Sequence, residues 1–328
     1  MSKILKLIAS IFLVAAFCLA FTADNYSEAA TNKNTKATAE EKKALQLFRQ
    51  SLLATVNDNK KIFHQFFLFT VPDFQGELEF NGKVTGHSLD VAGNLGIWIS
   101  GANGKVSDFD VPFYITQNQN NMEFYYNTDK QWKKYIAPIV AAKMTDVITS
   151  PTREEVEKQV AMVKNVQVLQ ENDSRRTLLV RLDGNKLADE FAEELKNQAT
   201  KNPSDKGTAQ EDAIQSKIFN YIDTGIRRAD LWYTWKIDKK NNQTGAIIFD
   251  LSPIIQEIAR AALDDPENDD LPDGLREILE TFAFFSEFRA YTSFLGPEAE
   301  SSLAVPQDVI NSAKLDEDLV KPENIPAK

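Results

Sequence analysis

Gly76–Pro138 reads GELEFNGKVTGHSLDVAGNLGIWISGANGKVSDFDVPFYITQNQNNMEFYYNTDKQWKKYIAP, and this stretch decides the fold. Apolar and polar residues alternate along most of it: Leu78 and Phe80 share one side, and Glu77 and Glu79 share the other. A period of two is typical of half-buried β-strands. Turn-forming residues near or between the runs occur at 81–82, 101–104 and 118–121. The pattern predicts an antiparallel meander with one apolar and one solvated face.

The meander continues through further apolar sets with the same spacing. They are Leu89, Val91, Leu95, Ile97 and Ile99, then Phe109, Val111, Phe113 and Ile115, and finally Met122, Phe124 and Tyr126. Trp98 is out of phase with its neighbours, so we expect it on the opposite side of its strand, as a candidate exposed contact residue.

The rest of the chain adds helical spacing and shorter strand-like runs. Helices are predicted at 41–53, 139–148, behind the capping box Thr152–Glu155, and at 187–198, 209–228, 253–263 and 274–281. Strands are predicted at 64–69, 166–169, 177–182, 229–238, 245–251 and 284–294. Ser252 is expected to cap a helix that has Pro253 at its first position. This order predicts an α+β fold, a mostly antiparallel sheet with helices packed on one face.

The charge balance narrows the classes of partner. Asp and Glu number 48 against 37 Lys and Arg, which gives a net charge of −11. Such a charge disfavours non-specific binding to nucleic acid or to an anionic membrane surface, although local peripheral contact with a membrane stays open. Phe is frequent, with 21 residues, many of them in strand-like runs, and this suits a wide apolar surface on a sheet.

Few residues are available for nucleophilic or metal chemistry. Cys18 is the single cysteine and lies in the N-terminal apolar segment, so a processed chain has no thiol. His64 and His87 are the two histidines, which disfavours a zinc site or a histidine-dependent triad. We therefore predict a protein without a cofactor or a metal and without enzymatic activity.

The N-terminus resembles a secretory signal. Lys3 and Lys6 precede an apolar stretch at 7–21, which is short for a membrane span. Cleavage is expected near Ala20 or Ala29, and an uncleaved anchor is the alternative. Phe17 stands before Cys18 where a lipoprotein signal needs a small residue. The predicted location is extracytoplasmic, either periplasmic or secreted.

These boundaries divide the chain into four parts. They are a signal peptide at 1–30, a flexible leader at 31–40, a single α+β domain at 41–315 with a helical insert at about 185–228, and a polar tail at 316–328. A monomer is expected.

The order of elements resembles the LolA/LppX-like superfamily of bacterial extracytoplasmic lipid and lipoprotein carriers. The resemblance covers most of 41–315. It is carried by Val111–Ile115, Met122–Tyr126, Gln131–Tyr135, Asp230–Lys236, Phe249–Ser252 and Phe288–Thr292. Several relatives are lipoproteins, whereas this chain lacks the required cysteine motif, and its helical insert is long.

The resemblance implies a curved antiparallel sheet, an incomplete β-barrel, with helices on its concave side and an apolar cavity between them. Apolar pockets with few polar groups bind lipids. The side chains expected to line the cavity are Phe80, Phe113, Phe124, Tyr126, Tyr233, Trp235 and Phe288. The alternative is that helices fill the face and that these residues are core.

Two polar clusters invite other interpretations. The acidic run 264–274, with Glu280 behind it, faintly resembles a calcium loop, but Leu271 occupies a ligand position and a solvated loop is the simpler explanation. Asp108 and Asp110 share one face of a strand, as an acid/base pair of a glycosidase could, or as solvated residues usually do. Arg227 and Arg228 suit a helix C-terminus electrostatically.

The sequence thus predicts a secreted or periplasmic, non-catalytic protein that carries a lipid, an acyl chain or a lipoprotein in an apolar cavity. The alternative is an envelope sensor or scaffold of the same fold that binds a protein partner through the helical insert and no lipid. Cavity volume distinguishes the two.

Overall fold

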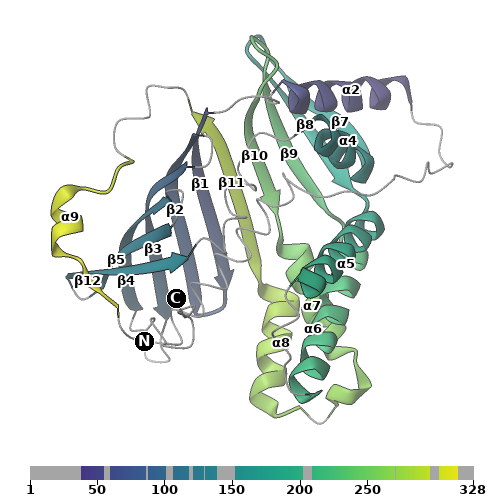
Figure 1. Ribbon diagram of the computed structural model, residues 1–328. Coiled ribbons are helices and arrows are strands. Elements are labelled where there is room, and N and C mark those ends of the chain that lie inside the picture. Colours follow the sequence, from purple (N-terminus) through teal and green to yellow (C-terminus); the bar gives the residue numbers. More distant parts are fainter. Residues whose placement is uncertain are drawn as a thin grey trace.

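The computed structural model describes residues 38–54, 60–85, 88–100, 106–117, 121–128, 130–138, 152–201, 209–269, 271–295 and 303–316. Twelve strands in these ranges form one sheet, in the order β12-β6-β5-β4-β3-β2-β1-β11-β10-β9-β8-β7. The strands at the two ends of this order do not pair, so the sheet is open and not a closed barrel (Figure 1). The predicted α+β class is confirmed.

The meander predicted from the alternating pattern is present. The strands of this half are β1 (Lys60–Val71), β2 (Phe74–Thr85), β3 (Ser88–Ser100), β4 (Val106–Gln117), β5 (Asn121–Thr128) and β6 (Gln131–Pro138). Each pairs antiparallel with the next. In β2, Leu78, Phe80 and Val84 are buried while Glu79 and Asn81 are exposed, as the alternation predicts.

The second half of the chain extends the same sheet. Its strands are β7 (Val163–Glu171), β8 (Arg175–Leu182), β9 (Trp232–Asp238), β10 (Thr244–Asp250) and β11 (Glu287–Leu295). The halves join where β11 pairs antiparallel with β1, from Ile62↔Leu295 to Thr70↔Glu287. One sheet therefore carries residues that are more than two hundred positions apart in sequence.

Helix α2 (Ala39–Leu53) covers part of this sheet. It begins two residues before the predicted Glu41, because Thr38 accepts a hydrogen bond from the Glu41 N–H and the Glu41 side chain reaches back to Thr38. Ala44, Phe48 and Leu52 recur at helical spacing and are buried. The last positions of the predicted leader are therefore the cap and first turn of this helix.

Helix α4 (Arg153–Met162) lies beside α2. Its predicted capping box is confirmed, since Thr152 and Glu155 make both reciprocal hydrogen bonds. Val156 is fully buried, and Glu157 forms an ion pair with Arg49 of α2. The predicted helix 139–148, His87 and the predicted signal peptide lie outside the described residues.

Four further helices stack side by side beyond one end of the sheet (Figure 1). They are α5 (Gly184–Lys201), α6 (Ala209–Arg228), α7 (Ser252–Leu263) and α8 (Asp273–Phe285). The predicted insert corresponds to α5 and α6. Helix α5 packs against α6, α6 packs against α7, and α7 packs against α8. Contacts of α7 with β11 and of α8 with β1 join this layer to the sheet.

Two predictions about these helices are wrong. Ser252 does not cap α7: it is the first helical residue, and its buried hydroxyl donates to Asp250 and accepts from the Phe288 N–H, which joins β10 to β11. The predicted strand from Phe284 starts too early. Phe284 and Phe285 continue α8, and β11 begins at Glu287.

The C-terminal segment returns to the opposite edge of the sheet. Leu303 is buried, α9 (Gln307–Ser312) lies against β6, and β12 (Lys314–Leu315) pairs with β6. This pair is parallel, unlike every other pair in the described sheet. Asp316, the first residue of the predicted polar tail, is 5% exposed and donates its N–H to the Lys134 carbonyl.

Candidate functional site

One face of the sheet is apolar from strand to strand, and we call it the inner face. The strand register places one row of residues side by side across β8, β9, β10, β11, β1, β2, β3 and β4. This row is Val180, Tyr233, Phe249, Ala290, Phe67, Leu78, Leu95 and Val111. The inner face therefore runs without interruption through both halves of the chain.

All of the predicted cavity residues lie on the inner face. The strand register places Phe80, Gly93, Phe113 and Tyr126 side by side, as a second row across β2, β3, β4 and β5. Phe124 pairs with Ile115 beside them, and Phe288 pairs with Phe69. Phe124 is half-buried, and every other predicted residue is at most 8% exposed.

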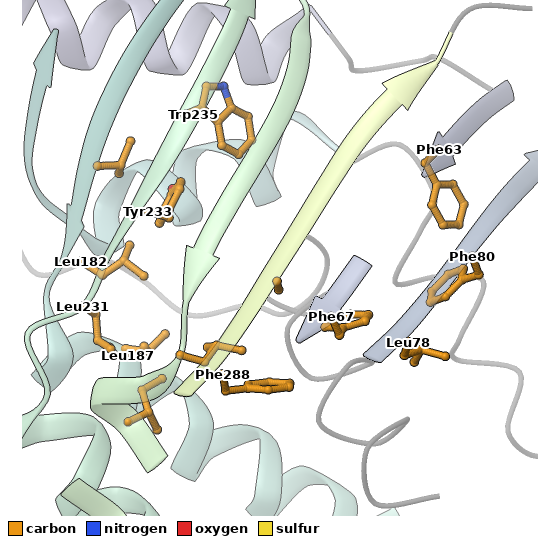
Figure 2. Packing of buried hydrophobic residues seen from close by; sticks show 14 of the residues in the cluster. Phe63, Phe67, Leu78, Phe80, Leu182, Leu187, Leu231, Tyr233, Trp235 and Phe288 are labelled. Atoms are coloured by element: carbon orange, nitrogen blue, oxygen red, sulfur yellow. The ribbon is translucent and has the colours of Figure 1, made fainter. Parts of the chain in front are cut away.

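The predicted residues of the meander and Phe288 are joined by a chain of ring contacts. Phe67, which was not predicted, connects them: it stacks on Phe288 with centroids 6.1 Å apart and lies 6.3 Å from Phe80. The chain continues from Phe80 to Phe113 at 6.3 Å, to Phe124 at 6.0 Å and to Tyr126 at 5.4 Å. Figure 2 shows Phe67, Phe80 and Phe288 converging from three strands.

Tyr233 and Trp235 form a separate group, which α2 covers. Both point to the same side of β9 (Figure 2), and their rings lie 5.9 Å apart. Phe48 of α2 meets the Trp235 ring edge-on at 5.1 Å. Burial raises the pKa of the Tyr233 phenol far above its ordinary value, so it stays neutral. In this part of the inner face the predicted residues are packed as core.

Some polar side chains on or against the inner face were not predicted. Trp235 Nε1 donates to the buried Ser51 hydroxyl of α2 at 2.9 Å. Gln65, 1% exposed, accepts a hydrogen bond from Thr292 of β11. Gln65 lies on the same side of β1 as Phe63 and Phe67, so a strict application of the period of two places it on the inner face.

A small apolar pocket opens beside Phe67 and Phe288. Its volume is about 10 Å³, about enough for one water molecule. The lining residues are Phe67, Phe69, Phe74, Gly76, Glu77, Leu78, Leu95, Ile97 and Phe288, and the exposed lining surface is entirely apolar. Phe69 and Phe74 are half-buried rings 5.9 Å apart, so side chains that are only partly packed form one wall of the pocket.

The polar clusters weighed from the sequence do not converge on a site. Asp108 and Asp110 are exposed, and Asp110 accepts a hydrogen bond from Asn94. His64 approaches Asn81 and Glu79 on the solvated face. Trp98 also lies on that face, as its phase predicts, and its ring occupies the space above Gly96.

The acidic loop is tied to α6 by hydrogen bonds and ion pairs. Asp264 pairs with Arg228, and Lys217 lies 3.2 Å from both Asp265 and Glu267. Tyr221 donates to Asp265, and its hydrogen bond is the first cause of a lowered pKa for that carboxyl. Within the described ranges, no group of three His, Cys, Asp or Glu side chains could hold a metal ion.

Where the structure is described, no helix is long and apolar enough to cross a membrane. No protein-family model matches the chain, and no curated protein matches it.

A search of solved structures finds a match to the crystal structure of LprF from Mycobacterium bovis. The match covers 82% of this chain and 99% of LprF, with 10% sequence identity and a TM-score of 0.37. At this TM-score the similarity adds no argument, and the architecture rests on the strand pairing described above.

Proposed function

We propose that this protein is a non-catalytic binding protein for an apolar ligand, a lipid or another molecule with an acyl chain, and that it works outside the cytoplasm. The observation that carries the proposal is the inner face, an apolar surface that crosses the sheet from β8 to β4 and contains an apolar pocket over β11, β1, β2 and β3. The pocket presents no exposed polar surface to a ligand, so its chemistry suits hydrocarbon.

Binding requires the pocket to enlarge. A volume of about 10 Å³ does not admit an acyl chain, so a ligand must displace side chains. Phe69 and Phe74 are the candidates, because both are half-buried and lie at the end of the sheet. Each buried methylene contributes about 0.8 kcal/mol, which offsets the cost of separating two rings after a few carbons.

The proposed location rests on the N-terminal segment. Lys3 and Lys6 before an apolar stretch, and small residues near Ala20 and Ala29, fit an export signal. A carrier of this kind would shield the apolar part of its ligand from water during transfer.

Lipid analysis of the exported protein tests the proposal. We expect native mass spectrometry to show a lipid adduct, and Phe74→Asp to lower the bound fraction, because it places a charge in the pocket wall. Leu169→Asp is the matched control, since Leu169 is 55% exposed on β7, away from the pocket. A wild-type protein that shows only the mass of the bare chain and takes up no fluorescent fatty acid contradicts the proposal.

One observation favours a second function. The aromatic residues of the inner face are closely packed, and α2 covers Tyr233 and Trp235, as expected of a scaffold or sensor that holds no lipid. Helices α5 and α6 would then offer the surface for a protein partner. The same experiment separates the two functions, because a scaffold yields the bare mass in every variant.

A further inference from the structure

Exposed apolar side chains gather at one end of the sheet, and we call this end the mouth. The turn from β1 to β2 lies here, with the end of β3, the start of β4 and the junction of α8 with β11. On the strands, Ile99 is 42% and Phe109 is 50% exposed, although both have the parity of the inner face. The inner face is therefore not covered where it reaches the mouth.

Helix α8 adds an apolar stripe to the mouth. Leu275, Ile278, Phe282 and Phe285 follow the spacing i, i+3, i+7 and i+10, so they lie along one side of the helix, over about 15 Å. Ile278 is 52% and Phe285 is 65% exposed. The neighbouring side packs inward, with Ala283 fully buried beside α7. An amphipathic helix normally buries such a stripe, and this one presents it to solvent.

The stripe leads to the pocket. The Phe282 ring lies 5.9 Å from Phe69, and Phe69 lines the pocket 6.0 Å from Phe288. On the strand side, Ile99 pairs with Phe74 and Phe109 pairs with Ile97, and Phe74 and Ile97 also line the pocket. Exposed apolar groups on two sides thus border the same opening.

The residue types at the mouth favour lipid over protein as the partner. The exposed groups are Phe, Ile and Leu, whereas the residues that dominate protein–protein binding energy are mostly Trp, Tyr and Arg. Apolar side chains of this kind insert shallowly into the boundary between headgroups and acyl chains. Large exposed apolar patches in a soluble chain are unusual unless they bind something.

The charged side chains around the mouth determine which kind of lipid surface it can bind. Asp73, Asp108 and Glu277 are exposed and directly precede Phe74, Phe109 and Ile278 in the chain. The nearby Arg260 is engaged with Glu257 and with the Phe284 ring. Acidic side chains repel an anionic surface, and this repulsion weakens as salt is added.

We propose that the mouth docks on a zwitterionic lipid surface, through the α8 stripe together with Ile99 and Phe109, so that the pocket opens towards the acyl chains of that surface. This inference builds on the proposed function, because docking would bring the ligand source to the pocket. Docking itself, however, needs only the exposed groups.

Flotation with phosphatidylcholine vesicles tests the docking. We compare the exported wild-type protein with Ile278→Ser/Phe285→Ser, and with Leu169→Ser and Ile218→Ser as controls at exposed apolar positions on β7 and α6. All variants share the same N-terminus, so differences report the substituted surface. We expect the double variant to lose at least about tenfold in partitioning, since two apolar side chains no longer leave water. The controls should bind as the wild type does.

Two outcomes overturn the docking: a wild-type protein that stays with the soluble fraction, or a double variant that binds vesicles as well as the wild type. Vesicles with phosphatidylglycerol give a further check, because binding should be weaker at low salt and recover as salt rises. Stronger binding to the anionic vesicles at low salt contradicts the assigned surface.

Uptake of a monomeric fluorescent fatty acid, measured without vesicles, separates this inference from the proposed function. If docking fails while the wild type and the double variant both take up the fatty acid, the docking surface is wrong and the binding function stands. If the wild type docks but takes up no fatty acid, the binding function is wrong and the docking stands.

Discussion

At the residue scale, Ser51 connects α2 to the inner face. Its hydroxyl accepts from Trp235 Nε1 at 2.9 Å and donates to the Phe48 carbonyl at 2.7 Å, and Ser51 is fully buried. Ser51→Ala leaves the indole N–H without this acceptor, so we expect it to lower the free energy of unfolding by about 1–3 kcal/mol. Urea denaturation measures the change.

A matched control is available on α9. Ser312 also donates to a carbonyl of its own helix, but it is exposed, so Ser312→Ala should change stability by less than about 0.5 kcal/mol. If Ser51→Ala lowers the free energy of unfolding as little as Ser312→Ala does, the Trp235 hydrogen bond does not hold α2 on the sheet.

Gly93 is the second decisive residue, because it lets two predicted site residues approach each other. A Cβ at this position would lie 2.4 Å from the Glu79 carbonyl oxygen, 2.4 Å from Phe80 Cβ and 2.8 Å from the Phe113 ring. We expect Gly93→Ala to destabilise the fold by about 1–3 kcal/mol, through overpacking. Gly245→Ala is the control, since the nearest atom to its Cβ would be the Lys236 oxygen at 3.7 Å. Equal thermal stability of the two variants would contradict close packing at Gly93.

At the element scale, the β7–β8 hairpin is held at its tip by Glu171. Arg176 makes hydrogen bonds to both of its carboxylate oxygens, and Lys239, in the turn between β9 and β10, lies 2.9 Å away. These hydrogen bonds, with that from Arg176 first, lower the pKa of Glu171 from 4.5 to about 2. Because the pKa is lowered on folding, the stabilisation is fully present above about pH 4.5 and is lost as the pH falls towards 2.

Glu171→Gln should therefore remove part of the loss of stability between pH 4.5 and pH 2. Urea denaturation at a series of pH values measures this, and NMR titration of the carboxyl checks the pKa directly. A variant whose stability falls as steeply with acid as that of the wild type would show that the ion pair forms equally in the unfolded chain.

The elements that sequence could predict are those with a clear local period. The meander alternates because each strand turns one side towards the core, so the pattern alone predicts its strands and the side on which Phe80, Phe113 and Tyr126 lie. The length of α8 was underestimated, because its last turn, Phe282–Phe285, consists of consecutive apolar residues that fit a strand as well as a helix. The exposed stripe of the mouth was missed for the same reason.

The sequence predicts which face of the sheet carries the candidate site, but it does not predict which helix packs on that face. The alternation along the strand places Tyr233 and Trp235 on the correct side. The sequence around them, however, does not show that Phe48, far away in the chain, packs on them. The pocket likewise depends on the β1–β11 pairing, which joins the two halves. Strand β12 has only two residues, too few to show a period.

At the scale of the whole molecule, the segment 303–316 completes the sheet at its β6 edge. Asp316 is buried there, accepts a hydrogen bond from Tyr126 and lies 3.7 Å from Lys133. Strand β12 contributes only two residues to the pairing, so side-chain contacts must provide much of its attachment. A predicted site residue, Tyr126, is thereby linked to the end of the described chain.

Asp316→Ala should release this edge without unfolding the sheet. Edge elements open locally at a lower free energy than the whole domain, so we expect faster hydrogen exchange in β6 and β5, while the amides of β9 keep the wild-type rate. Leu315→Ala is the control, because Leu315 is 51% exposed and its backbone pairing survives the change. Uniform acceleration in all strands would mean that Asp316 stabilises the whole domain; unchanged exchange in β6 would mean that backbone pairing alone holds β12. Faster exchange confined to β6 and β5 would identify the segment 303–316 as a closure of the meander that opens independently of the mouth.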